Sequence, residues 1–303
     1  MDKFFKLSEK NTDVKTEILA GITTFLAMAY ILGVNPSILH DAGMDINAVF
    51  LATAVASGIT SLIMGLLANY PVALSAGMGV NALFAYTICG AMGYSWQAAL
   101  AAVLISGLIF LVISVTGIRK KIIDAIPMQL KFAIGAGIGF FVAFVGLKNA
   151  GIIVANESTY VALGNFTDPT VLLALFGIII TIGLVAKKVP AGVFVGMVIT
   201  AIVGIILGAL GFKGMPSLPD HAFTSTFEMS TFGACFGGFG ELFKSPLSAF
   251  VIIFSFLFVD FFDTAGTLIS VGNQIGIVKP DGELIGVEKA LFTDAFGTCL
   301  GAV

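Results

Sequence analysis

Long apolar runs separated by short polar segments constrain the fold of this chain more than any other feature. A helix needs about 20 apolar residues, with a range of roughly 17–25, to cross the hydrocarbon core of a bilayer. Runs of this kind lie at 18–34, 48–67, 72–90, 97–117, 130–147, 170–186, 191–211 and 247–271, and a ninth begins near Lys289. Backbone groups surrounded by lipid must pair with one another, so the runs predict membrane-spanning helices.

The balance of charged and apolar residues supports lipid as the solvent. Only 11% of the 303 residues are charged and 58% are hydrophobic, whereas about 25% are charged in an ordinary soluble domain. The fold class predicted is therefore an all-α polytopic membrane protein. A net charge of −3 gives no basic surface for nucleic acid. The cysteines Cys89, Cys235 and Cys299 lack the spacing of a disulfide framework or metal site, so no cofactor is expected.

The distribution of lysine and arginine predicts the orientation. Alternating the runs from a cytoplasmic N-terminal segment, residues 1–17, places twelve basic residues inside and three outside: Lys148, Lys213 and Lys244. This bias follows the positive-inside rule and indicates a multi-pass protein of the cytoplasmic membrane. The outer segment 212–246 is too polar and glycine-rich to span, and a short amphipathic helix in the membrane interface is expected there.

The third run contains residues that are unfavourable in a membrane helix. Gly77 and Gly79 each weaken a helix by about 1 kcal/mol, and Asn81 carries an amide with two donors and an acceptor. One interpretation is a close helix contact in which Asn81 bonds a neighbouring helix. The other is a broken helix whose freed backbone groups line a mid-membrane cavity, as in many transporters. The residues alone leave both open.

The eighth run contains two aspartates at membrane depth. Asp260 and Asp263 are three residues apart and are expected to share a helix face. A carboxylate at the bilayer centre costs about 2.5–3.5 kcal/mol on the insertion scale, and two neighbouring carboxylates repel, so at least one should bind a proton near neutral pH. A structural pair satisfied by Thr264 and Thr267 is the alternative to a proton-coupled carrier. Asp294, near the start of the ninth run, is expected close to the cytoplasmic interface.

Three motifs, in order along the chain, resemble a known family. They are GITTFLAMAYI at 21–31, AGMGVNA at 76–82 and DFFDTAGTL at 260–268. They are similar to the hypoxanthine/guanine/adenine permeases of the nucleobase:cation symporter superfamily, of the uracil and xanthine permease type. The resemblance implies fourteen spans in two inverted repeats of seven, a core domain and a gate domain, and broken third and tenth spans.

The same resemblance implies a domain organisation. Residues 18–211 would form the first inverted repeat of seven spans, and residues 247–303 would begin the second repeat with the eighth span and part of the ninth. The family's tenth span contributes another acidic residue to the site, and this sequence stops before it. The chain is therefore expected to be a fragment of a longer permease, and a homodimer is compatible with the resemblance.

The resemblance also implies a substrate and a site. Asn81 and the backbone of Gly79 and Val80 would face a purine, Asp263 would accept from a ring N–H, and Asp260 would couple transport to a proton. The related uracil carriers have a glutamate where Asp263 falls and a histidine where Thr267 falls, so Thr267 is also expected in the site. The implied function is proton-coupled import of hypoxanthine, guanine or adenine. One of Phe84, Phe261 and Phe262 would stack on the ring, and the sequence does not choose among them.

Two other functions are alternatives to a purine permease. An anion or other small-solute carrier on the same fold would need a basic or neutral eighth-span site, and the two aspartates argue against it. An intramembrane aspartyl protease also uses paired acids, but it needs them on different helices facing a cleft. The sequence therefore predicts a transporter and not an enzyme.

Overall fold

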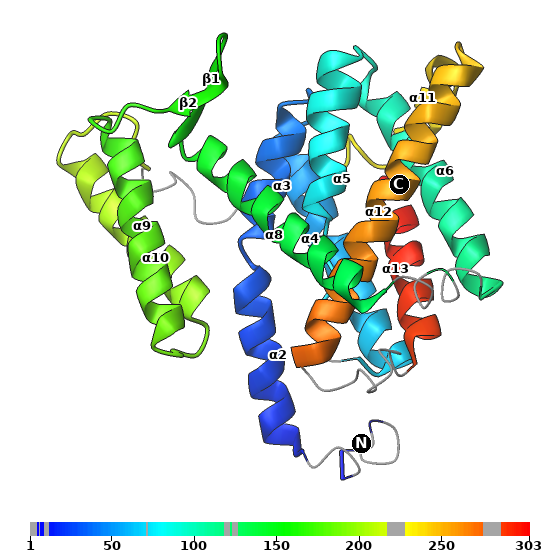
Figure 1. Ribbon diagram of the computed structural model, residues 1–303, viewed down its shortest axis with the longest axis horizontal. Helices are drawn as coiled ribbons and strands as arrows, with labels where there is room; N and C mark the ends of the chain where they lie inside the picture. The colour runs from blue at the N-terminus through cyan, green and yellow to red at the C-terminus, as the bar shows by residue number, and fades with distance from the viewer. Residues whose placement is uncertain are drawn as a thin grey trace. The chain divides into compact units, whose positions relative to one another are not determined.

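The computed structural model of this chain describes residues 5, 7–8, 12–70, 72–117, 122, 127–216, 228–274 and 286–303. Within those residues it is predominantly helical (Figure 1), as expected for a chain built of apolar runs. Six helical segments are long and apolar enough to cross a membrane: Val14–His40, Ile46–Ala68, Trp96–Val115, Pro169–Ala186, Gly192–Ala209 and Pro246–Leu268. Shorter apolar helices cover Met78–Ala91 and Gly139–Asn149. The helical membrane architecture predicted from the sequence is thus confirmed.

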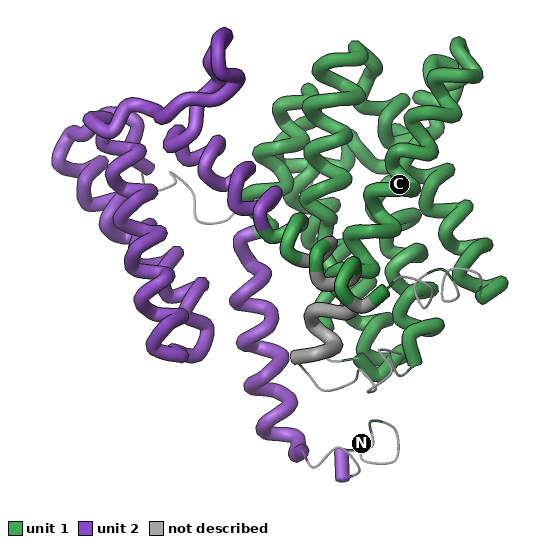
Figure 2. Tube along the Cα trace, viewed as in Figure 1, with its two compact units in different colours: residues 1–6, 31–139, 226–303 green, residues 7–30, 140–225 purple. Residues whose placement is uncertain are grey.

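The chain divides into two compact units, coloured separately in Figure 2. Unit 1 comprises residues 1–6, 31–139 and 226–303, and unit 2 comprises residues 7–30 and 140–225. The first apolar run contributes to both units, because it forms two helices, α2 (Val14–Met28) and α3 (Ile31–His40), and not one. The polar residues singled out in the third and eighth runs all belong to unit 1.

Unit 1 is organised around α6, the span with the largest buried share among the described ones. Helix α6 (Trp96–Val115) packs against α11 (Cys235–Leu242), α12 (Pro246–Gln274) and α13 (Val287–Ala302). Glycines allow the closest approaches, because a Cβ at Gly107 of α6 would lie 2.9 Å from Cys299 Sγ of α13. Helix α4 (Ile46–Ile63) continues into the π-helix η1 (Met64–Ala68).

The third run is interrupted, as the broken-helix interpretation predicted. Residues 72–77 are not helical, α5 begins only at Met78 and ends at Ala82, and the π-helix η2 (Leu83–Ala91) follows. Serines of α4 supply hydrogen bonds to the non-helical segment: Ser61 Oγ accepts from Leu74 N–H (2.9 Å) and donates to Leu74 C=O (3.1 Å). Both backbone groups of Leu74 are thereby satisfied, as a buried backbone requires.

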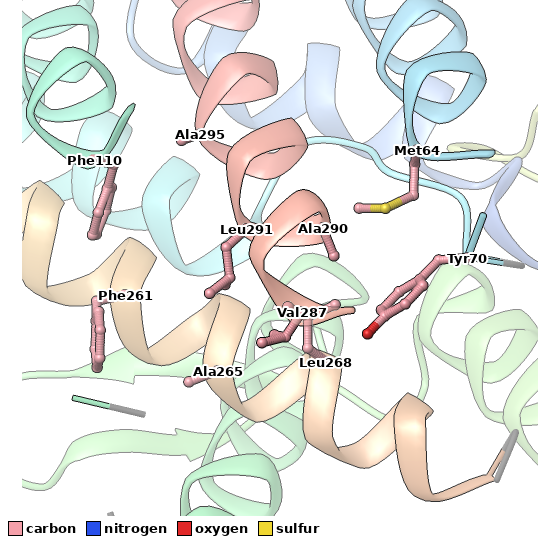
Figure 3. Close-up of a cluster of buried hydrophobic side chains, with 10 residues drawn as sticks. All are labelled: Met64, Tyr70, Phe110, Phe261, Ala265, Leu268, Val287, Ala290, Leu291 and Ala295. Atoms are coloured by element: carbon pink, nitrogen blue, oxygen red, sulfur yellow. The ribbon is translucent and has the colours of Figure 1, made fainter. Parts of the chain in front are cut away.

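Unit 1 contains a cluster of buried hydrophobic side chains (Figure 3). Its aromatic residues are Tyr70, Phe110 and Phe261. The rings of Phe110 and Phe261 are stacked, with centroids 6.4 Å apart. Aliphatic residues of α13, including Leu291 and Ala295, fill the space between them. The cluster includes residues of α6, α12 and α13. Its α12 members are Phe261, Ala265 and Leu268, so it helps to position the part of α12 that carries Asp260 and Asp263.

A short helix lies between residues 212 and 246, as expected, and its position outside the membrane stays a prediction. This helix is α11, and its Gly238 packs against the backbone of Gln97 at the start of α6. Glu241 of α11 accepts hydrogen bonds from the backbone N–H (3.0 Å) and the hydroxyl of Ser95, the N-cap of α6. Residues 217–227 of this outer segment lie outside the described residues.

Unit 2 contains α2, the second half of α8 (Met128–Asn149), a β-hairpin, α9 (Pro169–Ala186) and α10 (Gly192–Ala209). The strands β1 (Ile153–Asn156) and β2 (Tyr160–Leu163) pair antiparallel, an element that the all-α expectation missed. Helices α9 and α10 meet through small residues, because a Cβ at Gly177 would lie 2.7 Å from Thr200 Oγ1. Contacts between small residues are the usual way in which helices associate in lipid.

Candidate functional site

The Asp263 carboxylate lies against the break in the third run. A Cβ added at Gly77 would be 2.8 Å from Asp263 Oδ2, and one added at Gly79 would be 4.0 Å from the same oxygen. Helix α12 thus brings a half-buried acid to the residues where α5 begins. The two features singled out in the sequence, far apart along the chain at Gly77 and Asp263, meet in one place.

The first turn of α5 adds backbone donors at this point. Asn81 N–H bonds Gly77 C=O, so the N–H groups of Gly79 and Val80, which precede it in the helix, have no acceptor within α5. Such N–H groups favour an electronegative partner. The predicted role of the Gly79 and Val80 backbone is therefore chemically reasonable, and it stays a prediction.

Asp260 and Asp294 each accept a hydrogen bond from a threonine of the other's helix. Thr298 of α13 donates to Asp260 Oδ2 (3.2 Å), and in the opposite direction Thr264 of α12 donates to Asp294 Oδ2 (2.8 Å). The hydroxyl that bonds Asp260 therefore comes from α13. The alternative in which Thr264 and Thr267 satisfy an aspartate pair on α12 does not describe these contacts.

Asp294 lies within α13, about two turns from the start of the helix. Helix α13 begins at Val287, and seven residues at 1.5 Å each put Asp294 about 10 Å from that end. Thr298 links Asp294 to Asp260, because its hydroxyl lies 3.2 Å from Asp260 Oδ2 and 3.3 Å from Asp294 C=O. The structure thus brings three acids together where the sequence indicated two.

Asn81 belongs to a buried chain of hydrogen bonds. Its Nδ2 donates to Asn35 Oδ1 on α3, Asn35 Nδ2 donates to Thr53 Oγ1 on α4 (2.7 Å), and Thr53 donates to Val49 C=O (2.6 Å). Asn35, Thr53 and Asn81 are 4, 6 and 8% exposed. Asn81 therefore does bond a neighbouring helix, as the packing interpretation held, and the same residue lies in the turn that faces Asp263.

The aromatic candidates differ in their surroundings. Phe84 and Phe261 are buried in the core, and Phe261 stacks on Phe110. Phe262 is only partly buried and meets Phe258 edge-on, with centroids 4.6 Å apart. Phe262 is therefore the least buried of the three, and its stacking on a ligand stays a prediction. Thr267, also expected in the site, is exposed on α12, and its role stays a prediction.

Several residues that build this region carried no strong signal in the sequence. Asn35 and Thr53 look like ordinary polar residues tolerated in spans, and Thr298 lies in a run whose start was uncertain. Ser57 and Ser61, which bond Ser75 and Leu74, are spaced four apart on one face of α4. That spacing is the one signal that could have identified them.

Comparison with known proteins decides the family. The permease family model of the xanthine and uracil type matches residues 15–303. The chain is 45% identical over its whole length to the guanine/hypoxanthine permease PbuG of Bacillus subtilis, covering 69% of that protein. It is 42% identical over 99% of its length to the guanine/hypoxanthine permease PbuO of the same bacterium, covering 68% of it. It is 38% identical over its whole length to the adenine permease AdeP of Escherichia coli, covering 66% of it.

The chain belongs to this permease family. The resemblance drawn from the three motifs is therefore confirmed, and the permease is a transporter and not an enzyme. Its several apolar helices agree with a multi-pass membrane protein. The chain spans about two thirds of the length of these relatives.

Proposed function

We propose that this permease carries a purine nucleobase, hypoxanthine, guanine or adenine, across the cytoplasmic membrane by proton symport. The observation that carries the proposal is the position of the Asp263 carboxylate against Gly77 and Gly79, where the third run is broken. The relatives whose names specify a guanine, hypoxanthine or adenine permease support the choice of substrate.

A purine presents alternating donors and acceptors around a flat ring, and the site offers partners for both. The Asp263 carboxylate would accept a ring N–H, and the Gly79 and Val80 N–H groups would donate to a ring nitrogen or carbonyl. Bonds to a charged group contribute more than neutral ones, about 1.5–3 kcal/mol. Phe262 would stack on the ring face. A few polar groups placed in this way suffice to orient a small ligand.

Proton coupling follows from the acids that surround the substrate position. Asp260 and Asp294 accept hydrogen bonds from Thr298 and Thr264, and Asp263 lies one turn along α12 from Asp260. Such a group of carboxylates in a membrane environment favours holding at least one proton, because full ionisation would place three negative charges together. Asp260, which accepts from Thr298, is the proposed proton carrier. Binding of the substrate beside Asp263 would change the electrostatic potential at Asp260. Substrate binding and protonation of Asp260 would then be coupled. A carrier of anions would avoid such a site.

The domain organisation is proposed on the same basis. Residues 1–17 would be cytoplasmic, 18–211 would form the first repeat, 212–246 would lie at the outer interface, and 247–303 would begin the second repeat. The separation into unit 1 and unit 2 supports a core domain that holds the site and a gate domain that moves against it. A homodimer is compatible with this organisation.

Uptake of radiolabelled hypoxanthine by cells that express the whole permease tests the proposal. Asp263→Asn should weaken binding about ten- to hundred-fold, since losing a bond to a charged group costs about 1.5–3 kcal/mol. Asp45→Asn is the matched control: Asp45 caps α4 outside the site, and asparagine caps a helix equally well. Unaltered hypoxanthine binding by Asp263→Asn would refute the contact. Failure of the unmodified permease to take up any purine would refute the function.

A further inference from the structure

The hydrogen-bond chain through Asn35 has a direction. Val49 C=O can only accept, so the single hydroxyl hydrogen of Thr53 points to it and the Thr53 oxygen accepts from Asn35 Nδ2. That leaves Asn35 Oδ1 to accept from Asn81 Nδ2. Each amide therefore presents its nitrogen toward Thr53 and its oxygen away from it.

The opposite direction is less favourable because it makes fewer bonds. If Thr53 donated to Asn35 Oδ1, Asn35 Nδ2 would donate to Asn81 Oδ1, and the bond from Thr53 to Val49 C=O would be lost. Two hydrogen bonds would replace three in a buried site where all three side chains are less than a tenth exposed. An unmade bond between buried groups is unfavourable, so the observed direction is preferred.

The direction fixes what Asn81 can offer to a ligand. Its Nδ2 is engaged by Asn35, so its Oδ1 is the atom turned away from the relay. Buried side-chain polar atoms without a partner are, in the described part of the chain, Thr12 Oγ1 and Ser106 Oγ. Asn81 Oδ1 is not one of them. Asn81 keeps 8% of its surface exposed, and its Oδ1, which is not bonded to Asn35, is the atom that can accept a hydrogen bond from a ligand.

We propose that Thr53 and Asn35 form a fixed-polarity relay that holds Asn81 as a hydrogen-bond acceptor, so that the site selects 6-oxopurines over 6-aminopurines. The inference rests on the proposed function and deepens it. Hypoxanthine and guanine carry N1–H on the six-membered ring, whereas adenine carries a bare ring nitrogen there. The imidazole ring of any purine can move its proton between two nitrogens, so a fixed acceptor would not discriminate at that edge. Thr53 and Asn35 are positioning residues, because they act through Asn81.

The test compares ligands that differ at N1. Hypoxanthine, adenine and 6-methoxypurine, which also has a bare N1, compete with radiolabelled hypoxanthine for the whole permease in detergent. Thr53→Val keeps the shape of the side chain and removes the hydroxyl. Asn35 and Asn81 can then bond in either direction with one bond each way, so the bias should vanish. Thr53→Ser, which retains the hydroxyl, is the matched control.

The ratio of affinities is the deciding readout, because general damage to the fold weakens all three ligands together. The unmodified permease and Thr53→Ser should prefer hypoxanthine to 6-methoxypurine and adenine by about tenfold, equivalent to 1.4 kcal/mol. Thr53→Val should reduce that preference to within about twofold. If Thr53→Val does not fold, Asn35→Leu, which frees the Asn81 amide to rotate, should produce the same loss of preference.

The outcomes separate the relay from the function. A preference that persists unchanged in Thr53→Val and in Asn35→Leu, or the absence of any preference in the unmodified permease, would overturn the relay alone. If the unmodified permease binds no hypoxanthine, the proposed function fails and the relay inference fails with it.

Discussion

Gly77→Ala should weaken purine binding by moving the Asp263 carboxylate. The backbone of Gly77, with φ −76° and ψ 119°, suits alanine without strain, so the change acts through its new methyl group. That Cβ would lie 2.8 Å from Asp263 Oδ2, whereas an ordinary van der Waals contact starts at 3.4 Å. The carboxylate must therefore move by at least the difference between 3.4 and 2.8 Å, about 0.6 Å.

A shift of this size is large compared with the tolerance of a hydrogen bond. A donor–acceptor pair set near 2.8 Å would stretch toward 3.4 Å, beyond the usual range of 2.7–3.2 Å. Losing most of one charge-assisted bond costs about 1.5 kcal/mol, or roughly tenfold in affinity. The fold should be little affected, because the carboxylate is the end of a side chain and can give way.

Two other glycines make the comparison quantitative. At Gly79 the added Cβ would be 3.3 Å from Val259 Cγ1 and 4.0 Å from Asp263 Oδ2, so Gly79→Ala should change affinity by less than about threefold. At Gly58 of α4 no atom lies within 4 Å of the added Cβ, and Gly58→Ala serves as the control. Calorimetric titration of the purified permease with hypoxanthine gives the three affinities. Equal affinities for Gly77→Ala and Gly58→Ala would show that the Asp263 carboxylate does not contact the substrate.

Two further predictions concern acidic residues and pH. Asp260→Asn should preserve hypoxanthine binding but flatten the pH dependence of uptake, since an amide cannot exchange protons; an unchanged pH profile in a series of uptake assays would contradict the coupling role. The hydrogen bond from the Ser95 side chain, and then that from its backbone N–H, lower the pKa of Glu241. Because the folded-state pKa is depressed, the contact between α11 and α6 should be most stable above the ordinary glutamate pKa of about 4.3 and weaken as pH falls through the lower folded value. Amide hydrogen exchange of α11 should show that loss in the unmodified permease and not in Glu241→Gln, whose protection should be independent of pH.

The sequence predicted those parts of the site whose residues are costly in lipid. Asp260 and Asp263 stand out because two acids in a membrane span are costly. Gly77, Gly79 and Asn81 stand out because they are unfavourable in a membrane helix. The helix break was one of two interpretations that these residues left open, and the helix in segment 212–246 was expected because that segment is too polar and glycine-rich to span. Each of these inferences used properties of a single segment.

What the sequence did not predict depends on contacts between segments. Asn35 became important only when α3 was found to bring it to Asn81, and nothing in its own neighbourhood separates it from a tolerated polar residue. The ninth run was expected to begin near Lys289, and α13 begins close by, at Val287. The hydrogen bond from Thr264 to Asp294 could not be predicted from either segment alone, because it joins α12 and α13. The first turn of a membrane helix can contain polar residues that an apolar run does not include. The apolar run therefore locates the end of the helix poorly.

The two units also differ in the chemistry of their spans, and this difference bears on which one holds the substrate. Helices α9 and α10 of unit 2 contain no aspartate, glutamate, lysine or arginine, and their contact relies on glycine and threonine. Unit 1 contains Asp260, Asp263 and Asp294 within or beside its helical core. A charged group in a span lowers stability and has to be compensated by hydrogen bonds, as the threonine pairs of α12 and α13 do here. Packing alone needs no such groups, as α9 and α10 demonstrate, so their concentration in unit 1 supports the proposal that the substrate site lies in unit 1.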